Sequence, residues 1–349
     1  MTALSRSHYN AAMRVGILGG GNISETHARA ALSVPGVEIA AFCGQSADKV
    51  ARLAREYGGG AYTDLDSFLA HRPMDFVAIG SPSGVHAQQG IAAAERGLHV
   101  LVEKPIDVTT KRADELIAAA DRAGVRLGVF FQDRLRPSVT EMKRLVVDGL
   151  LGKPVIISGR VKWYRPPEYY SRSRWRGTLA LDGGGALMNQ AIHTVDLLLF
   201  LFGPVTRVSA ATATRIHAIE AEDTAVALLE FESGALGTIE ATTSAYPGYD
   251  RRIEMTGAEG TVILEHDRLA RVDLRSGAPV NTAAGDTTPS ASSPVVSDAS
   301  AHARVIEDFV RAIRTNTVPA CDGREGRRSV ELVQAIYRSA KEKAPVAVG

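Results

Sequence analysis

The stretch Arg14–Ser24, RVGILGGGNIS, decides the fold. A short apolar run ends in three glycines, and a helical pattern begins at Ser24. Only a backbone without Cβ lets a pyrophosphate approach closely, and the amides at the start of a helix then bind it. The stretch therefore predicts a dinucleotide-binding strand, turn and helix, with Ser24 in place of the third glycine. The residues at the cofactor would be Gly19, Gly21, Asn22 and Ile23; the alternative is a tight turn that binds no ligand.

The rest of the first third alternates short apolar runs with helical patterns. Strand-like runs cover residues 37–43, 75–79, 98–103 and 126–131, and a helical pattern covers 47–57. This alternation is typical of an α/β fold. We therefore expect a doubly wound parallel sheet of the Rossmann type over residues 14–133, preceded by a flexible extension over residues 1–13.

The period of the pattern changes after residue 134. Strand-like runs now follow one another with short turns between them, at residues 153–163, 206–214, 224–232 and 236–243. We expect an α+β C-terminal domain over residues 134–349, with a large, mainly antiparallel open sheet and terminal helices that close the structure. Residues 276–300 are rich in Ser, Thr, Ala, Pro and Gly, which predicts an exposed loop.

Length and charge exclude several classes of protein. The 349 residues suffice for two domains, and 40 Lys and Arg against 39 Asp and Glu leave a net charge of +1. Such a chain has no global field that would attract nucleic acid or an anionic membrane. The two cysteines, Cys43 and Cys321, make no disulfide framework, and the apolar run 195–202 is too short to cross a bilayer. We expect a cytoplasmic, enzyme-like protein.

The choice between NAD and NADP depends on the end of the second predicted strand. An NAD site usually places a carboxylate there for the ribose 2′-hydroxyl, but this chain has Gly44, Gln45 and Ser46. Ser46 together with Lys49 or Arg52 could contact a 2′-phosphate. The sequence predicts an NAD(P) site with a slight preference for NADP; the alternative is that Lys49 and Arg52 only form the solvated face of a helix.

Three further motifs carry a family resemblance. Ser81–His86 (SPSGVH) follows one predicted strand, Glu103-Lys104-Pro105 follows the next, and Gly183–Asp196 (GGGALMNQAIHTVD) lies in the second domain. In this order they resemble the Gfo/Idh/MocA family of oxidoreductases, over nearly the whole chain. The stretch Trp175–Gln190 is most similar to the branch that contains UDP-N-acetylglucosaminuronate 3-dehydrogenase and inositol dehydrogenase.

The resemblance implies a cofactor, a substrate class and an assembly. It implies hydride transfer between NAD(P) and a secondary ring hydroxyl or ketone of a sugar, a nucleotide sugar or an inositol, in a homo-dimer or homo-tetramer. It also implies cofactor contacts from Ser81, Pro82, His86, Glu103, Lys104 and Gln132. For Gln132 and for Arg134, packing between domains is the alternative.

Lys104, His193 and Asn189 are the candidate catalytic residues. An ammonium at Lys104 could stabilise alkoxide charge, and the imidazole of His193 could accept the hydroxyl proton. Asn189 precedes His193 by four residues, which on an α-helix places both on one face. Many members of the family carry Asp where Asn189 stands, and a neutral amide cannot stabilise imidazolium as a carboxylate does. Asp196 is expected to support His193 or to cap a turn.

The segment Trp163–Gly177 (WYRPPEYYSRSRWRG) gathers aromatic and arginine side chains of the kind that bind sugars. An oligomer or domain interface is the alternative, because the same residue types dominate interfaces. No metal site is expected, since the nine histidines are scattered. The predicted substrate-binding residues are Lys104, Trp163, Arg165, Tyr170, Trp175, Arg176, Asn189 and His193.

Two other functions compete with the dehydrogenase. One is an NAD-dependent glycosidase that acts by transient oxidation and elimination. The other is a non-catalytic sensor of cofactor or sugar on the same fold, and the presence of both Lys104 and His193 counts against it.

Overall fold

The computed structural model describes residues 12–280 and 299–349. These residues form two compact units, the first made of residues 12–132 and 299–327 and the second of residues 133–280 and 328–349. Residues 299–327 thus belong to the first unit, whereas the sequence analysis placed everything after residue 133 in the second domain. The predicted extension over 1–13 and the predicted loop over 276–300 lie mostly outside the described residues.

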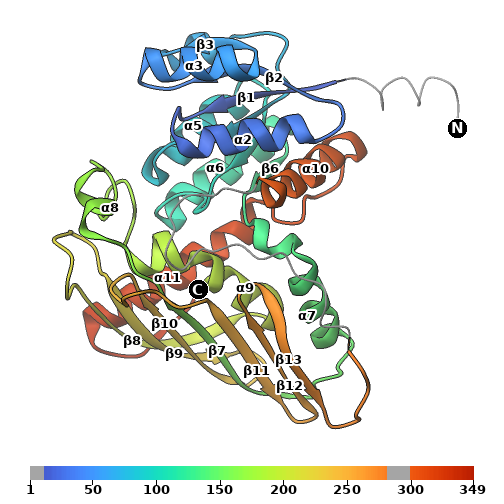
Figure 1. Ribbon diagram of the computed structural model, residues 1–349, viewed down its shortest axis with the longest axis vertical. Coiled ribbons are helices and arrows are strands. Elements are labelled where there is room, and N and C mark those ends of the chain that lie inside the picture. The colour runs from blue at the N-terminus through green and yellow to red at the C-terminus, as the bar shows by residue number, and fades with distance from the viewer. Residues whose placement is uncertain (1–11, 281–298) are drawn as a thin grey trace, which may run out of the picture. The chain divides into compact units, whose positions relative to one another are not determined.

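The first unit contains a six-stranded parallel sheet with the strand order β3-β2-β1-β4-β5-β6 (Figure 1). This is the predicted doubly wound arrangement, with the order reversing beside β1. The short β3 at the edge of the sheet was not predicted. The strands are β1 (Met13–Leu18), β2 (Val37–Cys43), β3 (Gly60–Tyr62), β4 (Phe76–Ile79), β5 (His99–Val102) and β6 (Leu127–Val129).

The helices of the first unit pack on this sheet through small residues. Helix α2 buries Ala28, Ala30 and Ala31 completely, and α10 packs against it. Small side chains let a helix approach a sheet closely, which fixes the position of the glycine-rich turn at the start of α2. The helices are α2 (Asn22–Ser33), α3 (Ala47–Tyr57), α4 (Leu65–Leu69), η1 (Ser83–Val85), α5 (His86–Ala94), α6 (Thr110–Ala123), η2 (Gln132–Leu135) and α10 (Ser300–Thr315).

The second unit contains an eight-stranded sheet with the order β13-β12-β11-β7-β10-β9-β8-β14. Among the strands in the described part of the chain, only the pair of β7 and β10 in this sheet is parallel, so the prediction of a mainly antiparallel sheet is confirmed. The strands are β7 (Pro154–Lys162), β8 (Val205–Ala213), β9 (Thr224–Phe231), β10 (Leu236–Thr242), β11 (Arg252–Gly257), β12 (Gly260–Glu265), β13 (Arg268–Leu274) and β14 (Val346–Ala347). The strands β11, β12 and β13 were not predicted.

Helix α9 forms the core of the second unit. Its apolar residues surround the helix on all sides and are almost all buried, as expected for a helix covered from every direction. Among the described residues, no helix is both long and apolar enough to span a membrane. The remaining helices are α7 (Pro137–Val147), α8 (Pro167–Ser171), η3 (Ala186–Ala191), α9 (Ile192–Phe202) and α11 (Gly323–Glu342).

Candidate active site

The glycine-rich turn is crowded by protein on one side and open on the other. Gly19 has a φ of 147°, and a Cβ on it would lie 2.6 Å from the carbonyl oxygen of Gly80. A Cβ on Gly21, at the N-cap of α2, would meet no described atom within 4 Å. Ser24 is fully buried and its Oγ accepts a hydrogen bond of 2.9 Å from the Gly20 amide, so a serine here closes the turn. This open space beside a helix start fits a dinucleotide.

Two of the basic side chains predicted near a 2′-phosphate differ in their surroundings at the end of β2. Gln45 and Lys49 are exposed, but Arg52 is held by Glu25 at 3.1 Å and Glu56 at 2.9 Å. The sequence analysis also missed Asp64, which follows the neighbouring strand β3. Burial, together with the charge of Asp64, raises the pKa of Cys43 at the end of β2 to about 11. A carboxylate is therefore present near this corner of the sheet.

His86 connects the loops that follow β4 and β5. Its Nδ1 lies 2.8 Å from the carbonyl oxygen of Pro105, and its Nε2 lies 2.9 Å from that of Ser81. The ring is 1% exposed. Both ring nitrogens face backbone carbonyl oxygens, so the ring holds Ser81 and Pro105 together, and a cofactor contact from His86 stays a prediction.

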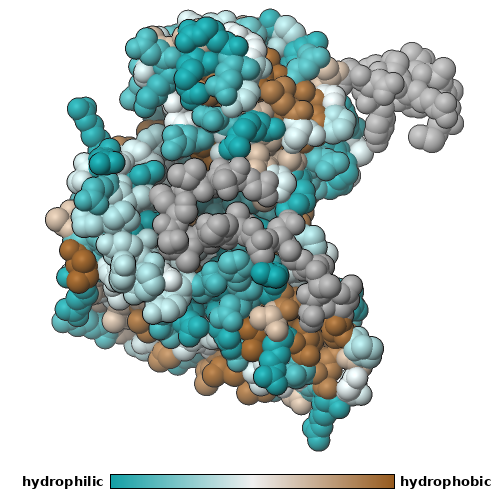
Figure 2. All heavy atoms as spheres, in the orientation of Figure 1, coloured by the Kyte–Doolittle hydropathy of each residue, from teal (hydrophilic) through white to brown (hydrophobic). Residues whose placement is uncertain are grey.

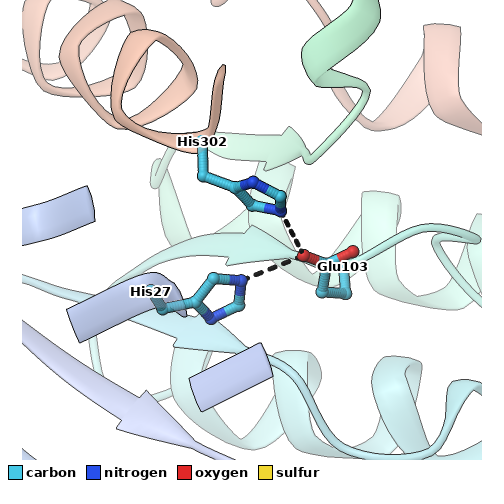
Figure 3. A group of neighbouring side chains, drawn as sticks. All are labelled: His27, Glu103 and His302. Carbon is cyan, nitrogen blue, oxygen red and sulfur yellow. Dashed lines mark hydrogen bonds and ion pairs between the residues drawn. The ribbon is translucent and has the colours of Figure 1, made fainter. Parts of the chain in front are cut away.

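Glu103 lies between two histidines that are far away in the sequence (Figure 3). Its Oε1 accepts from Nε2 of His27 at 3.0 Å and lies 3.3 Å from Nε2 of His302, and its Oε2 accepts from the Lys104 amide at 3.2 Å. His27 also stacks on Phe130, with ring centroids 4.5 Å apart. This His–Glu–His cluster (His27, Glu103 and His302) joins α2, the end of β5 and α10, and it fixes the backbone at Lys104.

The charges in the His–Glu–His cluster follow from its burial. Burial alone would raise the pKa of Glu103, but hydrogen bonds from His27 and His302 outweigh it and hold that pKa well below its usual value. Burial lowers the pKa of His27 in spite of Glu103. The cluster therefore holds an ionised carboxylate and a neutral His27. No metal site was predicted, but these three side chains bring potential ligand atoms within 4.8 Å of one another.

Gln132 carries a buried acceptor atom that could bind an N–H group of a ligand. Its Oε1 is buried and accepts no hydrogen bond within the described part of the chain. A buried acceptor without a donor is costly, so a bound group with an N–H would stabilise it. The cofactor contact at Gln132 stays a prediction. Lys104, Gln132 and the glycine-rich turn belong to the first unit, whereas Asn189 and His193 belong to the second.

Asn189 was predicted to lie on a regular α-helix together with His193. It lies instead in the π-helical turn Ala186–Ala191, and α9 begins only at Ile192. The predicted four-residue spacing on one α-helical face is therefore wrong. Asn189 donates to Asp182 at 2.5 Å and accepts from Gln190 at 2.7 Å. Its amide thus binds to the preceding loop.

The buried Glu222 explains the π-helical turn. Its carboxylate accepts from the amides of Gly185 at 3.0 Å and Leu187 at 2.8 Å, and from the Tyr337 hydroxyl at 2.8 Å. A Cβ on Gly184 would lie 2.1 Å from that hydroxyl, and a Cβ on Gly185 would lie 2.0 Å from the Glu222 carbonyl oxygen. The glycine run in the sequence allows this close approach. Wider π-type turns of this kind are frequent at functional sites.

His193 faces a carboxylate that the sequence analysis did not identify. Its Nδ1 lies 3.7 Å from Oδ2 of Asp133, which follows Gln132 in η2. Asp133 is 5% exposed and also binds Arg251 at 2.6 Å and Arg136 at 2.8 Å. Burial would raise the pKa of Asp133, but the charges of Arg251, His193 and Arg136 hold it well below the usual value. An ionised carboxylate therefore lies beside the imidazole.

Asp196 holds Arg134 rather than His193. Arg134 donates to both carboxylate oxygens of Asp196, at 2.7 and 2.8 Å, and Ser329 donates to the same carboxylate at 3.1 Å. Both Arg134 and Asp196 are at most 4% exposed. Such a two-pronged buried pair fixes η2 to α9, which places Asp133 beside His193.

The predicted substrate segment connects directly to Asn189 and Gln190. Gln190 accepts from Arg165 at 3.0 Å and donates to Tyr169 at 2.9 Å, and Arg176 lies 4.1 Å above the Tyr169 ring. Among the predicted residues, Trp163, Arg165 and Tyr170 are buried, while Trp175, Arg176 and Asn189 are partly exposed. A substrate contact from this segment stays a prediction, and the partly exposed side chains are the ones best able to make it.

Comparisons with known proteins agree with this architecture. Residues 13–131 match the profile described as "Oxidoreductase family, NAD-binding Rossmann fold", and residues 139–263 match that of the "GFO/IDH/MocA C-terminal domain". The WlbA dehydrogenase of Bordetella pertussis, solved with NADH and UDP-GlcNAcA, is 32% identical with a TM-score of 0.88, covering 97% of this chain and 99% of that one.

Two curated relatives are similar along most of their length. The D-apiose dehydrogenase of Paraburkholderia graminis is 29% identical over 93% of this chain and 87% of its own. The protein "D-xylose 1-dehydrogenase (NADP(+)) 2" of Haloferax volcanii is 31% identical over 96% of this chain and 99% of its own. The chain belongs to the Gfo/Idh/MocA family of oxidoreductases and carries the NAD-binding Rossmann fold of that family.

Proposed function

We propose that this protein is an NAD(P)-dependent dehydrogenase that oxidises a secondary ring hydroxyl of a sugar, a nucleotide sugar or an inositol. The observation that carries the proposal is the ionised Asp133 beside His193, because an imidazole next to a carboxylate is suited to take a proton from a hydroxyl. Relatives named as sugar dehydrogenases along nearly the whole chain support the same chemistry.

The residues divide the work in the proposed reaction. A bound nicotinamide supplies the hydride acceptor. His193 takes the hydroxyl proton, while the ammonium of Lys104 stabilises the negative charge that develops on the oxygen. The His–Glu–His cluster holds the backbone of Lys104, and Asn189 orients the substrate through its place in the network of Asp182 and Gln190.

For the cofactor, we propose that the site accepts both NAD and NADP, with a slight preference for NADP. Gly44, Gln45 and Ser46 offer no carboxylate that would repel a 2′-phosphate. Asp64 acts in the opposite direction, and Arg52 is already paired, so the preference rests on the exposed Lys49 and on Ser46. Fluorescence titration with NADH and NADPH measures it, with Lys49→Ala as the variant that should weaken NADPH binding alone.

For the assembly, we propose a homo-dimer or homo-tetramer formed through the sheet of the second unit. Figure 2 shows brown, apolar patches in the lower part of the view, where Figure 1 draws this sheet. Ile156 on β7 is paired with Leu236 on β10, and Leu228 lies on the adjacent β9; their side chains are 52%, 63% and 61% exposed. Exposed apolar patches of this kind mark interaction sites. Light scattering of the wild type and of Leu228→Glu tests this, and a monomeric wild type rejects it.

The activity assay follows absorbance of the reduced nicotinamide with a panel of sugars, inositols and UDP-sugars. Absorbance change with one substrate group, lost in His193→Ala, supports the dehydrogenase. Release of free sugar from glycosides without net absorbance change would favour the glycosidase. Cofactor binding with neither result would favour the sensor. The location in the cytoplasm stays a prediction from the cysteine content.

A further inference from the structure

The negative charge beside His193 belongs to a residue of the second unit that is far from it in the sequence. Asn189, where many members of the family carry Asp, is neutral and binds Asp182 and Gln190. The carboxylate of Asp133, sixty positions earlier in the chain and on η2, lies beside the imidazole. The two residues cannot be related by any local spacing.

The structure fixes the carboxylate of Asp133 from two sides. Arg136 donates to its Oδ1 at 2.8 Å, and Arg251 donates to its Oδ2 at 2.6 Å. Both arginines also pair with Asp267. Two carboxylates and two guanidiniums form a charge-balanced quartet (Asp133, Arg136, Arg251 and Asp267) in which Asp133 cannot swing away. Nδ1 of His193 lies 3.7 Å from Oδ2 of this fixed carboxylate.

We propose that Asp133 is the positioning residue for His193: its carboxylate keeps the imidazole proton on Nδ1 and thereby leaves Nε2 to accept the hydroxyl proton. The transfer of a hydroxyl proton to Nε2 rests on the proposed dehydrogenase activity, whereas the tautomer of the ring does not. A carboxylate on one ring nitrogen commonly selects the tautomer and stabilises the imidazolium that forms when the other nitrogen is protonated. Contacts of this kind are often long before substrate binds.

The charged groups around His193 decide the direction of the expected changes. Asp133 is the acid of the quartet that faces the ring, Arg136 and Arg251 stand behind it, and Asp267 completes the quartet from the turn between β12 and β13. One turn further along α9, Asp196 is neutralised by Arg134. Removing the charge of Asp133 leaves the two arginines facing the imidazole, which disfavours imidazolium.

The test measures the imidazole directly in the full chain, without cofactor or substrate. Nitrogen-15 spectra of histidine-labelled protein report the tautomer, and His193→Gln identifies the signal of His193. We expect an Nδ1–H tautomer in the wild type. In Asp133→Asn we expect a mixture of tautomers and titration of His193 at lower pH. If the neutral His193 ring of the wild type carries its proton on Nε2 and not on Nδ1, the proposal is overturned, and no variant is needed to show it.

The control removes the other acid of the same quartet. Asp267→Asn breaks ion pairs to the same two arginines. The backbone at Asp267 has a φ of 56°, which Asn adopts readily, so this substitution adds no backbone strain. We expect it to leave the tautomer of His193 unchanged. An equal effect of Asp267→Asn and Asp133→Asn would show that only the integrity of the quartet matters, and it would refute a specific role of Asp133.

Rescue distinguishes charge from fold. In Asp133→Asn, turnover with an identified substrate should fall roughly 10- to 100-fold while its KM changes little. Adding Asn189→Asp to this variant places a carboxylate where the family often has one. The double variant should recover part of the turnover, and the acid limb of its pH profile should lie closer to that of the wild type than the acid limb of Asp133→Asn does. No recovery in the double variant contradicts the proposal. If the spectra agree but no sugar is oxidised, the proposed function fails and the tautomer assignment stands.

Discussion

Replacing Glu103 by Gln should destabilise the first unit by about 3 kcal/mol. The carboxylate accepts three hydrogen bonds, two from buried histidines and one from the Lys104 amide. Hydrogen bonds to a charged group contribute roughly 1.5–3 kcal/mol each, and neutral ones about 1 kcal/mol. A glutamine keeps one acceptor oxygen, so it turns its NH₂ group towards a donor and weakens the remaining bonds. Relief of the buried charge offsets part of this loss.

The pH dependence of this effect has a defined sign. The pKa of Glu103 is depressed in the folded protein, so its contribution is fully present above the unfolded pKa of about 4.3 and is lost as the pH falls towards the folded value. The difference between wild type and Glu103→Gln should therefore persist from pH 7.5 to pH 5.5.

Urea unfolding combined with hydrogen exchange of peptides from α2, β5 and α10 measures the effect. Glu38→Gln is the matched control, because Glu38 pairs with Arg14 at 3.3 Å with a side chain that is 59% exposed. Exposed pairs contribute about 0–1 kcal/mol, so this control should change little. If Glu103→Gln changes the free energy of unfolding as little as Glu38→Gln does, the reasoning is refuted.

Three other outcomes follow from the structure. Lys104→Ala and His193→Ala should each lower turnover by at least ~10², and His193→Ala should leave the dissociation constant for NADH unchanged in fluorescence titration. Gly19→Ala should weaken NADH binding, since the new Cβ would lie 2.6 Å from the Gly80 carbonyl oxygen at a φ of 147°; Gly97→Ala, with open space around its Cβ, is the control for backbone strain. With a pKa of about 11, Cys43 should react with iodoacetamide at pH 8 far more slowly than in urea, as mass spectrometry would show; equal rates would contradict its burial.

The parts of the fold that follow from local patterns could be predicted from the sequence. The run of apolar residues before Gly19 and the small residues after Ser24 were enough to predict β1, the turn and α2. The strands β7, β9 and β10 alternate over most of their length between buried and more exposed residues, which gives the period of two that is typical of strands. The catalytic candidates were found through short motifs.

The parts that depend on distant residues could not be predicted. Glu222 and Tyr337 shape the π-helical turn at Asn189, although they lie 33 or more positions away in the sequence. Asp133 meets His193, and His302 meets Glu103, only after the chain has folded. Each of these residues alone is an ordinary charged or polar side chain, so no spacing rule identifies it.

The His–Glu–His cluster has a consequence for the order in which the protein is made. Glu103 leaves the ribosome 199 residues before His302, which at 5–20 residues per second is a delay of roughly 10–40 seconds. During that time the Rossmann sheet lacks α10, and the Glu103 carboxylate lacks one of its two histidine donors. The backbone around Lys104 therefore reaches its final arrangement only after residue 302 has been made, so premature termination before that residue yields a cofactor domain without its full set of supports.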